Sequence, residues 1–550
     1  MYLAGPNTIP GMVQSDMLAI GGSPNSSTPW GRIFTGDDDP SSDILRGRPL
    51  PVRSDAPSTL RMIASWLSSD QFTTCGKLPK RVIDVGTGSQ ERLYLSIDHN
   101  SSNEDDKRYI CLSHCWGHGK PLETTTSSLP DRIKAIVFAD LSETFKDCIR
   151  LTRFLGIKYL WIDSLCIVQD SKLDWEEESS KMGDYYSSSW LTILAGASTP
   201  KQGALFTYRV PEESLQLQLK WRGNVSSISM KIEADQAQTC TVDLGASALD
   251  SRGWTLQEQI LPARFLEFGP TQVSYRNKEY IRYECGRVLD IQHTQIPRRD
   301  IFLKPGSWFR LVECYTKRSL TVSEDKLPAL SGLAHEYQRT SGDRYLAGIW
   351  SRELWKGLFW RRDVDCLRSS GPEIYRAPSW SWAAVNGSII YLDKEIGGKE
   401  DLDRKQMIEI IESWVQPAGS DKMGRVKYGS LLLRGQLTVA VVEPPDDQQR
   451  CFICSEKSDT TPRKWTFFPD EDFKQLPQMF YILHLANGKG LALMKNARTG
   501  VQQHSRGYRG TLEVLRRIGF VEAEQSTVKT ASTKLIWPFK KKRKNRFLLI

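Results

Sequence analysis

The stretch that decides the fold runs from Lys158 to Gln169 and reads KYLWIDSLCIVQ. It opens with the bulky run Tyr159-Leu160-Trp161-Ile162, and a short unbroken apolar run predicts a strand buried on both faces, as in a parallel sheet. Asp163 follows at once. Because open α/β sheets bind ligands beyond the carboxyl ends of their strands, Asp163 stands where binding or chemistry is expected if the neighbouring strands are parallel.

Apolar segments on either side predict further strands and the helices that connect them. Tyr109–Ser113 (YICLS) and Trp190–Ala195 (WLTILA) are short apolar runs of the same kind. The apolar residues that share one helical face before the central stretch are Phe145, Cys148, Ile149, Thr152 and Leu155. Asp140 and Glu143 have capping-box spacing at the start of this helix, and Gly156 closes it. A more acidic helical pattern follows the central stretch, so the order of elements predicts two right-handed βαβ units.

The 550 residues are too many for one hydrophobic core, so two or three domains are expected. Hydrophobic residues make up 39% and charged residues 25% of the chain, an ordinary globular composition. Tyr345–Trp360 carries a tryptophan-dense apolar face that predicts a helix. The predicted segments are a poorly ordered N-terminal segment (1–75), an α/β core (76–290), a Trp-rich helical extension (291–387), a β-rich C-terminal region (388–530) and a basic tail (531–550).

Charge and cysteine usage predict an intracellular protein. The net charge of +9 is mild for this length and gives no sign of nucleic-acid binding. The 11 cysteines are an odd number and several lie in apolar runs, which favours a reducing compartment without a disulfide framework. No secretory signal is visible, and no apolar run reaches the roughly 20 residues that span a bilayer. We therefore expect a cytoplasmic protein, with the nucleus as an alternative.

Basic residues crowd the end of the chain. They are Lys540, Lys541, Lys542, Arg543 and Lys544. Such a run serves as a nuclear-import signal or a membrane-surface patch in some proteins, and the nearby Trp537, Phe539 and Phe547 add to the membrane interpretation. A solvated tail is the simplest interpretation, and we favour it.

The next dense stretch, Ser251–Gly269, together with the segments above, forms a series of motifs that resembles a known family. The matching blocks are Leu78-Pro79-x-Arg81, Tyr109–Gly117 (YICLSHCWG), Tyr159–Gln169, Arg252–Glu258 (RGWTLQE), Asp325–Ala329, Pro378–Trp382 and Arg517–Phe520. In this order they are similar to the heterokaryon-incompatibility (HET) domain of filamentous fungi and the segment that commonly follows it. His114 stands where that family more often has Tyr, so we give this histidine no catalytic weight.

The resemblance implies a role in non-self recognition and regulated cell death after incompatible cell fusion. It also implies a remote kinship to TIR domains, which are flavodoxin-like α/β folds, some of which cleave NAD with a glutamate. The expected fold is therefore α/β, with a TIR/flavodoxin-like parallel-sheet core, a helical extension and a small β-rich C-terminal region. The expected mode of action is self-association or the binding of a protein partner.

Two carboxylates are candidate catalytic residues, and each has a structural alternative. Asp163 would orient or bind a ligand, or it would anchor a loop by accepting backbone N–H bonds. Glu258 would stabilise an oxocarbenium-like ribosyl centre, as glycosidase carboxylates do. It would instead be the capping-box partner of Thr255, and we favour the cap because it explains the spacing alone. The sequence leaves open whether the protein is an enzyme.

The remaining candidates would bind a ligand rather than react with it. Arg252 would pair with a phosphate, or with Asp163 or Glu258 inside the fold. Trp116 and Trp254 would stack on a ring, although core packing is favoured for both. The polar side chains of Ser113 and Gln257 complete the set of candidates.

The sequence predicts neither a metal site nor a resident cofactor, although NAD is a candidate substrate. Cys111, His114 and Cys115 lack an evident fourth ligand, and Cys451-x-x-Cys454 is a lone pair. Cys166 with a distant histidine is an unsupported nucleophile pair. Gly86-Thr87-Gly88 lacks the third glycine of a dinucleotide-binding loop. Three hypotheses result: a HET-type signalling module, an NAD-cleaving hydrolase using Glu258 or Asp163, and a nuclear regulatory protein.

Overall fold

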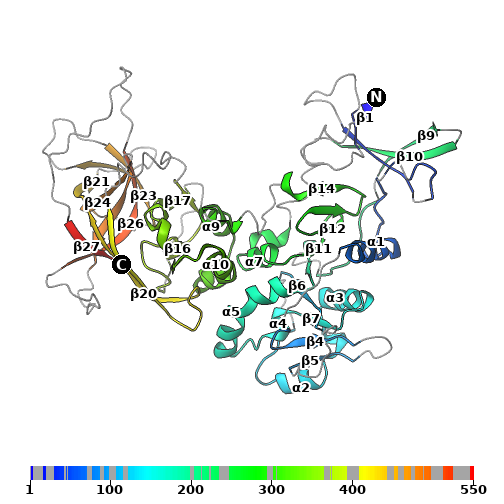
Figure 1. The fold of residues 1–550 in the computed structure, drawn as a ribbon, viewed down its shortest axis with the longest axis horizontal. Coiled ribbons are helices and arrows are strands. Elements are labelled where there is room, and N and C mark those ends of the chain that lie inside the picture. The colour runs from blue at the N-terminus through cyan, green and yellow to red at the C-terminus, as the bar shows by residue number, and fades with distance from the viewer. Residues whose placement is uncertain are drawn as a thin grey trace. The chain divides into compact units, whose positions relative to one another are not determined.

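A computed structural model gives the arrangement of the chain (Figure 1), which divides into two compact units, Met1–Arg299 and Asp300–Ile550. The described residues are 2–3, 17–19, 30–36, 38–42, 45, 47–70, 77–86, 92–97, 107–115, 122–197, 203–211, 213–221, 224–233, 247–293, 302–304, 306–363, 372, 374–392, 408–442, 451–455, 464–471, 477, 479–486, 489–496, 512–523 and 545–550. Within them no helix is both long and apolar enough to cross a membrane.

The first unit is built on a mixed sheet. Its described strands, in spatial order, are β14 (Val288–Asp290), β13 (Tyr280–Tyr283), β12 (Val273–Arg276), β11 (Phe265–Phe268), β8 (Leu191–Leu194), β6 (Tyr109–Ser113), β7 (Tyr159–Trp161), β4 (Val82–Asp84) and β5 (Tyr94–Ser96). The central strands β11, β8, β6 and β7 are parallel, and the outer strands pair antiparallel. The predicted strands therefore exist and are parallel to one another. Likeness to TIR or flavodoxin-like folds stays a prediction.

Helices connect and flank these strands (Figure 1). They are α1 (Pro57–Ser68), α2 (Leu129–Lys134), α3 (Glu143–Phe154), α4 (Asp163–Cys166), α5 (Lys172–Ser188) and α7 (Thr255–Ile260). The predicted face of α3 is buried at Phe145, Cys148 and Ile149. The predicted capping box is wrong, because Ser142 is the N-cap and its Oγ accepts from the Phe145 N–H at 3.3 Å. The short 3-10 helices of this unit are η2 (Phe138–Asp140), η3 (Ala248–Ser251) and η4 (Ile291–His293).

Gly156 ends α3 in the left-handed region, with φ at +68°, while a Cβ at this position would meet no atom within 4 Å. We expect Gly156→Ala to lower the free energy of unfolding by about 1–2 kcal/mol, because an L-residue strains this backbone conformation. Gly203→Ala is the matched control, since a Cβ there also meets nothing within 4 Å and its φ is ordinary. Urea unfolding of both variants tests this, and equal stabilities would contradict it.

Within residues 1–75 the structure describes a continuous segment, 47–70, that contains the helix α1. The helix α1 buries Ile63, Trp66 and Leu67 in the first unit, and the Thr59 hydroxyl donates to Glu284 at 2.7 Å. These apolar residues at helical spacing outweigh the Gly- and Pro-rich composition around them. A separate antiparallel sheet contains β1 (Tyr2–Leu3), β2 (Met17–Ala19), β3 (Trp30–Phe34), β10 (Asn224–Glu233) and β9 (Leu215–Trp221).

The second unit begins with a helical part that buries Trp308, Trp350, Trp360, Trp380 and Trp382. Its elements are α9 (Trp308–Thr316), η5 (Ser323–Lys326), α10 (Pro328–Ser341), β15 (Tyr345–Leu346), β16 (Ile349–Trp350), η6 (Ser351–Glu353), α11 (Leu354–Gly357), β17 (Trp360–Arg362), η7 (Trp382–Ala384) and β18 (Ile389–Tyr391). The single helix predicted over Tyr345–Trp360 is wrong. Ala347 and Gly348 have φ of +44° and +95°, so the chain reverses between β15 and β16.

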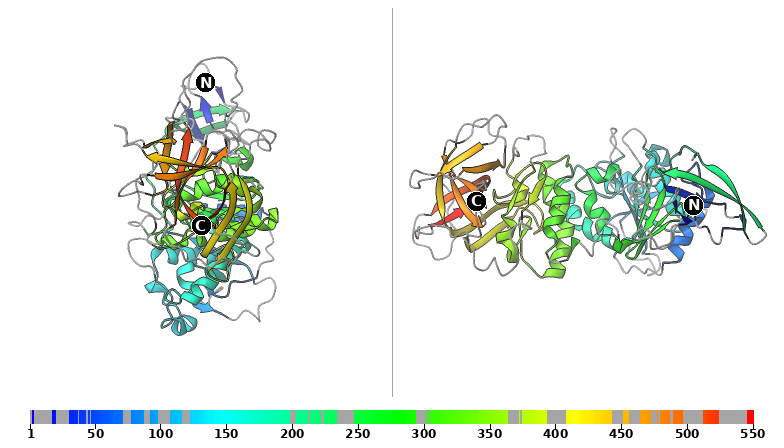
Figure 2. Two further views of the ribbon diagram at one scale, coloured as in Figure 1. Left: turned by 90° about the vertical axis from the view of Figure 1, so that its left-hand side faces the viewer. Right: turned by 90° about the horizontal axis from the view of Figure 1, so that it is seen from above.

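The β-rich region forms a second large sheet, coloured yellow to red in Figure 2. Its described strands, in spatial order, are β19 (Glu409–Pro417), β20 (Val426–Gly435), β27 (Asn545–Leu549), β26 (Glu513–Ala523), β23 (Lys464–Pro469), β22 (Cys451–Ser455), β21 (Leu437–Val442), β24 (Met479–Ala486) and β25 (Lys489–Lys495). Because β25 also pairs with β26, this part of the sheet closes on itself. The boundary predicted at residue 388 lies inside the second unit.

The end of the chain is not a solvated tail throughout. Strand β27 pairs with β20 and β26, and it buries Phe547 and Leu549 completely. Phe547 is therefore unavailable to a membrane, which removes one support for that interpretation. The basic run Lys540–Lys544, Trp537 and Phe539 lie outside the described residues.

Candidate functional site

The carboxyl ends of two parallel strands meet the start of α7 and bring the candidate residues together. Ser113 ends β6, and Asp163 follows β7, which pairs with β6 in parallel register. The helix α7 supplies Glu258, whose Oε2 accepts a hydrogen bond from Ser113 Oγ at 2.5 Å. Both side chains are buried, with Glu258 5% exposed. Residues 145 positions apart in the sequence thus form the centre of the site.

Glu258 is a carboxyl group that titrates near neutral pH. Its pKa is raised from 4.5 to about 7, with burial as the largest cause and the nearby charge of Asp163 as another. Hydrogen bonds from Ser113 and Tyr186 and the charge of Arg252 act in the opposite direction. A buried carboxyl with such a pKa is able to hold a proton at neutral pH or release it, as acid–base catalysis and pH switching require.

The capping-box interpretation of Glu258 is wrong. The N-cap of α7 is Trp254, and no side chain caps this helix. The Thr255 hydroxyl donates instead to the carbonyl oxygens of Leu249 and Arg252, at 2.5 and 2.8 Å. The spacing of Thr255 and Glu258 is that of a capping box, but the Glu258 carboxylate accepts its hydrogen bond from Ser113. The simplest structural explanation of Glu258 is therefore removed.

His114, which the sequence analysis set aside, belongs to the site. Its Nδ1 lies 4.0 Å from Asp163 Oδ1, and its ring packs edge-on against Phe145 with centroids 5.0 Å apart. Burial is the main cause that lowers the pKa of His114 below its usual 6.5, so the ring is neutral at neutral pH. Its Nε2 is buried and has no hydrogen-bond partner in the described structure. The sequence feature that indicates His114 as a site residue is its position directly after Ser113, at the end of a predicted strand.

Asp163 has the loop-anchoring role that the sequence offered as one alternative. Its Oδ1 accepts from the backbone N–H of Ser164 at 2.7 Å, and its carbonyl oxygen accepts from Gln169 Nε2 at 3.1 Å. The side chain remains 26% exposed, so a ligand role is also open to it. Asp163 thus shapes the start of α4 and places a negative charge beside His114 and Glu258.

The predicted ligand-binding residues differ from one another in their placement and contacts. Arg252 Nη1 donates to the carbonyl oxygen of His114 at 3.3 Å, which joins η3 to the end of β6. Trp254 packs edge-on against Trp175 with centroids 6.2 Å apart, and both side chains are half-buried. Gln257 is 1% exposed, and both polar atoms of its amide are buried without a hydrogen-bond partner. Trp116 lies outside the described residues.

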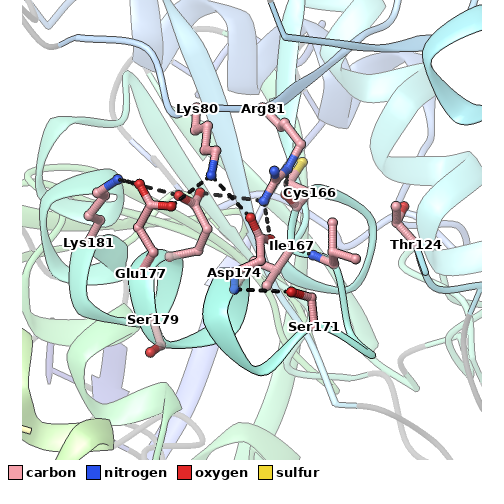
Figure 3. A network of polar contacts seen from close by, with 12 residues as sticks. Lys80, Arg81, Thr124, Cys166, Ile167, Ser171, Asp174, Glu177, Ser179 and Lys181 are labelled. Atoms are coloured by element: carbon pink, nitrogen blue, oxygen red, sulfur yellow. Dashed lines mark hydrogen bonds and ion pairs between the residues drawn. The ribbon is translucent and has the colours of Figure 1, made fainter. Parts of the chain in front are cut away.

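A network of charges holds α4 and the start of α5 in place (Figure 3). Arg81 Nε donates to the Cys166 carbonyl oxygen at 2.5 Å, and its Nη2 pairs with Asp174. Asp174 Oδ2 also accepts from the backbone N–H of Val168 at 2.9 Å. Lys80 lies 3.1 Å from Asp174 and extends the network to α5. The Pro-x-Arg lead-in thus fixes the loop that follows Asp163.

Cys111 and Cys166 are unsuited to nucleophilic chemistry. Burial raises the pKa of Cys166 to about 12 and that of Cys111 well above its usual value, so both thiols are protonated at neutral pH. Among the described residues no group of three or more His, Cys, Asp and Glu side chains is placed to hold a metal ion. Cys451 and Cys454 belong to β22, but their side chains lie outside the described structure, as do Thr87 and Gly88.

The structure brings Ser113, Asp163, Arg252 and Glu258 together, but Glu258 is enclosed. A cavity of about 980 Å³ exists in this unit, and its lining residues include none of these side chains. Instead it lies between α1 and the turn after β13. The arrangement therefore provides a titratable buried carboxyl and an enclosed polar network around it.

Comparison with known proteins identifies the segment that carries this site. Searches of curated proteins and of solved structures gave no match. The model of one family, described as Heterokaryon incompatibility protein (HET), matches residues 109–258. The match begins at the first residue of β6 and ends at Glu258, so it contains the motif blocks from Tyr109 to Glu258. Residues 109–258 of this chain therefore match the heterokaryon-incompatibility (HET) domain family.

Proposed function

We propose that this protein is a signalling module of non-self recognition that promotes regulated cell death after incompatible cell fusion, through self-association or a protein partner. The hydrogen bond between Ser113 and Glu258 carries the proposal. It connects β6, where the family match begins, to Glu258, where the match ends. A buried contact between the two ends of the matched segment supports a folded recognition unit.

The enclosure of the polar network favours a module over an enzyme. Ser113 and Gln257 are each 1% exposed, and Glu258 is 5% exposed. A glycosidic-bond hydrolase needs its carboxyl within reach of the substrate, and these side chains face protein instead. The charge of Arg252 is directed toward the end of β6, where it hydrogen-bonds to the chain itself.

The second candidate is an NAD-cleaving hydrolase of TIR-like type, and two observations favour it. Glu258 has a pKa of about 7, which suits a general acid or base. The Gln257 amide and His114 Nε2 are buried without hydrogen-bond partners in the described structure, and a bound ligand would satisfy them. In this candidate NAD is the substrate, and Glu258 or Asp163 acts on the glycosidic bond.

Two assays together test both candidates. The first is conditional expression in a filamentous fungal host, and the second measures NAD turnover by the purified full chain at high concentration with a crowding agent. The variants are Glu258→Gln, Asp163→Asn and the surface control Glu177→Gln. We expect induction of the wild type to arrest growth, the folded Glu258→Gln protein to retain this effect, and no preparation to consume NAD.

Each of the other outcomes has a defined meaning. If the folded Glu258→Gln protein loses both growth arrest and NAD turnover while Glu177→Gln keeps both, the hydrolase replaces the signalling module as the proposed function. A wild-type protein that accumulates in the host without any loss of viability would contradict the proposed cell-death role. Thermal melts of the purified variants establish which of them are folded.

A further inference from the structure

The cavity of about 980 Å³ in the first unit lies apart from the Glu258 site and has walls of three kinds. One face of α1 contributes Met62, Ser65 and Trp66, which recur at helical spacing. The second wall comes from β13 and the turn after it, and the third from the segment 48–51. Arg48 N–H donates to the Cys285 carbonyl oxygen at 2.9 Å, so this segment is tied to the turn.

The charge in the cavity is positive. Its lining residues include Arg48, Arg282 and Arg287 against one carboxylate, Glu284, a difference of 3 − 1 = +2. That carboxylate is already neutralised, because Arg209, which does not line the cavity, lies 2.8 Å from it. Thr59 and the Val273 N–H also donate to Glu284, at 2.7 and 2.9 Å. The arginines therefore dominate the electrostatics of the cavity.

The arginines are held in place rather than extended into solvent. Arg282 Nη1 donates to Ser69 Oγ at 2.9 Å, and its guanidinium lies 4.5 Å from the centroid of the Tyr280 ring. Arg48 donates to the carbonyl oxygens of Leu45 and Ser42, at 2.6 and 3.1 Å. Arg287 is 4% exposed. Pre-positioned guanidinium groups beside a cavity are suited to binding an oxyanion, because their side chains lose little conformational entropy when the ligand binds.

The uncharged part of the lining contains apolar and aromatic side chains as well as hydroxyl-bearing ones. Leu50, Met62, Trp66 and Tyr280 line the cavity together with the arginines. Trp66 also stacks on Tyr275 with centroids 6.2 Å apart, which fixes its ring. Cavities of this size, with mostly apolar walls and a few placed polar groups, are typical small-molecule sites. The combination fits a ligand with an anionic group and a flat apolar body.

We propose that this cavity binds an organic phosphate, a small molecule in which a ring system carries a phosphate monoester. A phosphate monoester carries about −1.5 to −2 charge at neutral pH, opposite in sign to the charge of the lining. The ring would pack against Trp66 and Met62, and the phosphate would pair with the arginines. This site is separate from the Ser113–Glu258 network and does not depend on the proposed function.

The proposal is tested by the binding of adenosine 5′-monophosphate to the purified full chain. Ligand-observed NMR and calorimetry measure this binding. Adenosine and inorganic phosphate are the matched fragments. We expect saturable binding of the monophosphate at least tenfold tighter than that of either fragment. Arg282→Gln should weaken it tenfold or more, because it removes one guanidinium without altering the core.

A second variant keeps the test informative if Arg282→Gln perturbs the fold. Ser65 is exposed and lines the cavity, so Ser65→Glu places a carboxylate among the arginines and should also weaken binding at least tenfold. The controls are Ser68→Glu and Arg61→Gln, which change exposed residues of α1 that do not line the cavity. Both controls should bind within twofold of the wild type.

Three results would overturn the proposal. They are the absence of saturable binding, an affinity for the monophosphate no higher than for adenosine, and equal affinities in Ser65→Glu and Ser68→Glu. Since none of these variants touches Ser113 or Glu258, growth arrest in the host should persist in all of them. Failure of this proposal and failure of the cell-death role are therefore distinguishable.

Discussion

Replacing Glu258 by Gln should make the protein more stable than the wild type at pH 8 by about 3 kcal/mol, while the two proteins have similar stability near pH 5. The folded-state pKa of about 7 exceeds the unfolded value of 4.5. The difference of about 2.5 corresponds to about 3 kcal/mol at about 1.36 kcal/mol for each pH unit. Gln is neutral at every pH and keeps an oxygen that accepts the Ser113 hydroxyl.

The sign of the pH dependence follows from the raised pKa. Between pH 4.5 and 7 the folded protein binds more protons at Glu258 than the unfolded chain does. The stabilisation that comes from holding this proton is complete below pH 4.5, and it is lost as the pH rises through 7. Above pH 7 the wild type must enclose a carboxylate, which burial and the charge of Asp163 disfavour.

Urea unfolding of both proteins at pH 5, 6, 7 and 8 measures this effect. Glu177→Gln is the control, because the pKa of Glu177 is lowered to about 2 by its contacts with Lys181 and Lys80. Glu177 is therefore ionised throughout the range, and its replacement should shift stability by the same small amount at every pH. A wild type and a Glu258→Gln variant that lose stability in parallel between pH 5 and 8 would exclude Glu258 as the titrating group.

The strands around Asp163 were predictable because their burial on both faces leaves a strong local pattern. The unbroken apolar runs at Tyr109–Ser113 and Tyr159–Trp161 are paired in the sheet. The partner of Glu258 was not predictable in this way. A spacing of three residues from Thr255 fits a cap equally well, and only the tertiary fold brings Ser113 to the carboxylate.

Two further differences between the sequence predictions and the structure have the same physical origin. The tryptophan spacing in residues 345–360 fits a helical face, but left-handed backbone at Ala347 and Gly348 turns the chain into a hairpin. At the C-terminus the basic run dominates the composition and hides the short pattern that places Phe547 and Leu549 in β27. In each case a long-range partner, rather than local periodicity, decides the structure.

The second unit depends on a buried ion pair, and removing its cation should be strongly destabilising. Arg517 is 2% exposed and donates from Nε and Nη2 to the two oxygens of Asp470, at 2.8 and 3.2 Å. It also donates to the carbonyl oxygens of Leu358 and Trp360, at 3.1 and 2.6 Å, and lies 3.4 Å from the centroid of the Trp360 ring. One side chain thus connects β26, the residue after β23 and the start of β17.

Arg517→Met should lower the free energy of unfolding by about 3–5 kcal/mol, since Met keeps much of the volume but leaves the Asp470 carboxylate buried without this partner. Adding Asp470→Asn should recover more than 1 kcal/mol, because the double variant no longer buries that charge. Arg516→Met is the matched control: its neighbouring guanidinium is 39% exposed, lies 3.3 Å from Glu471, and should contribute about 1 kcal/mol or less. Urea unfolding of the three variants decides the matter. If Arg516→Met and Arg517→Met were equally stable, the Arg517–Asp470 pair would not hold the second unit together, and its stability would have to come from apolar packing alone.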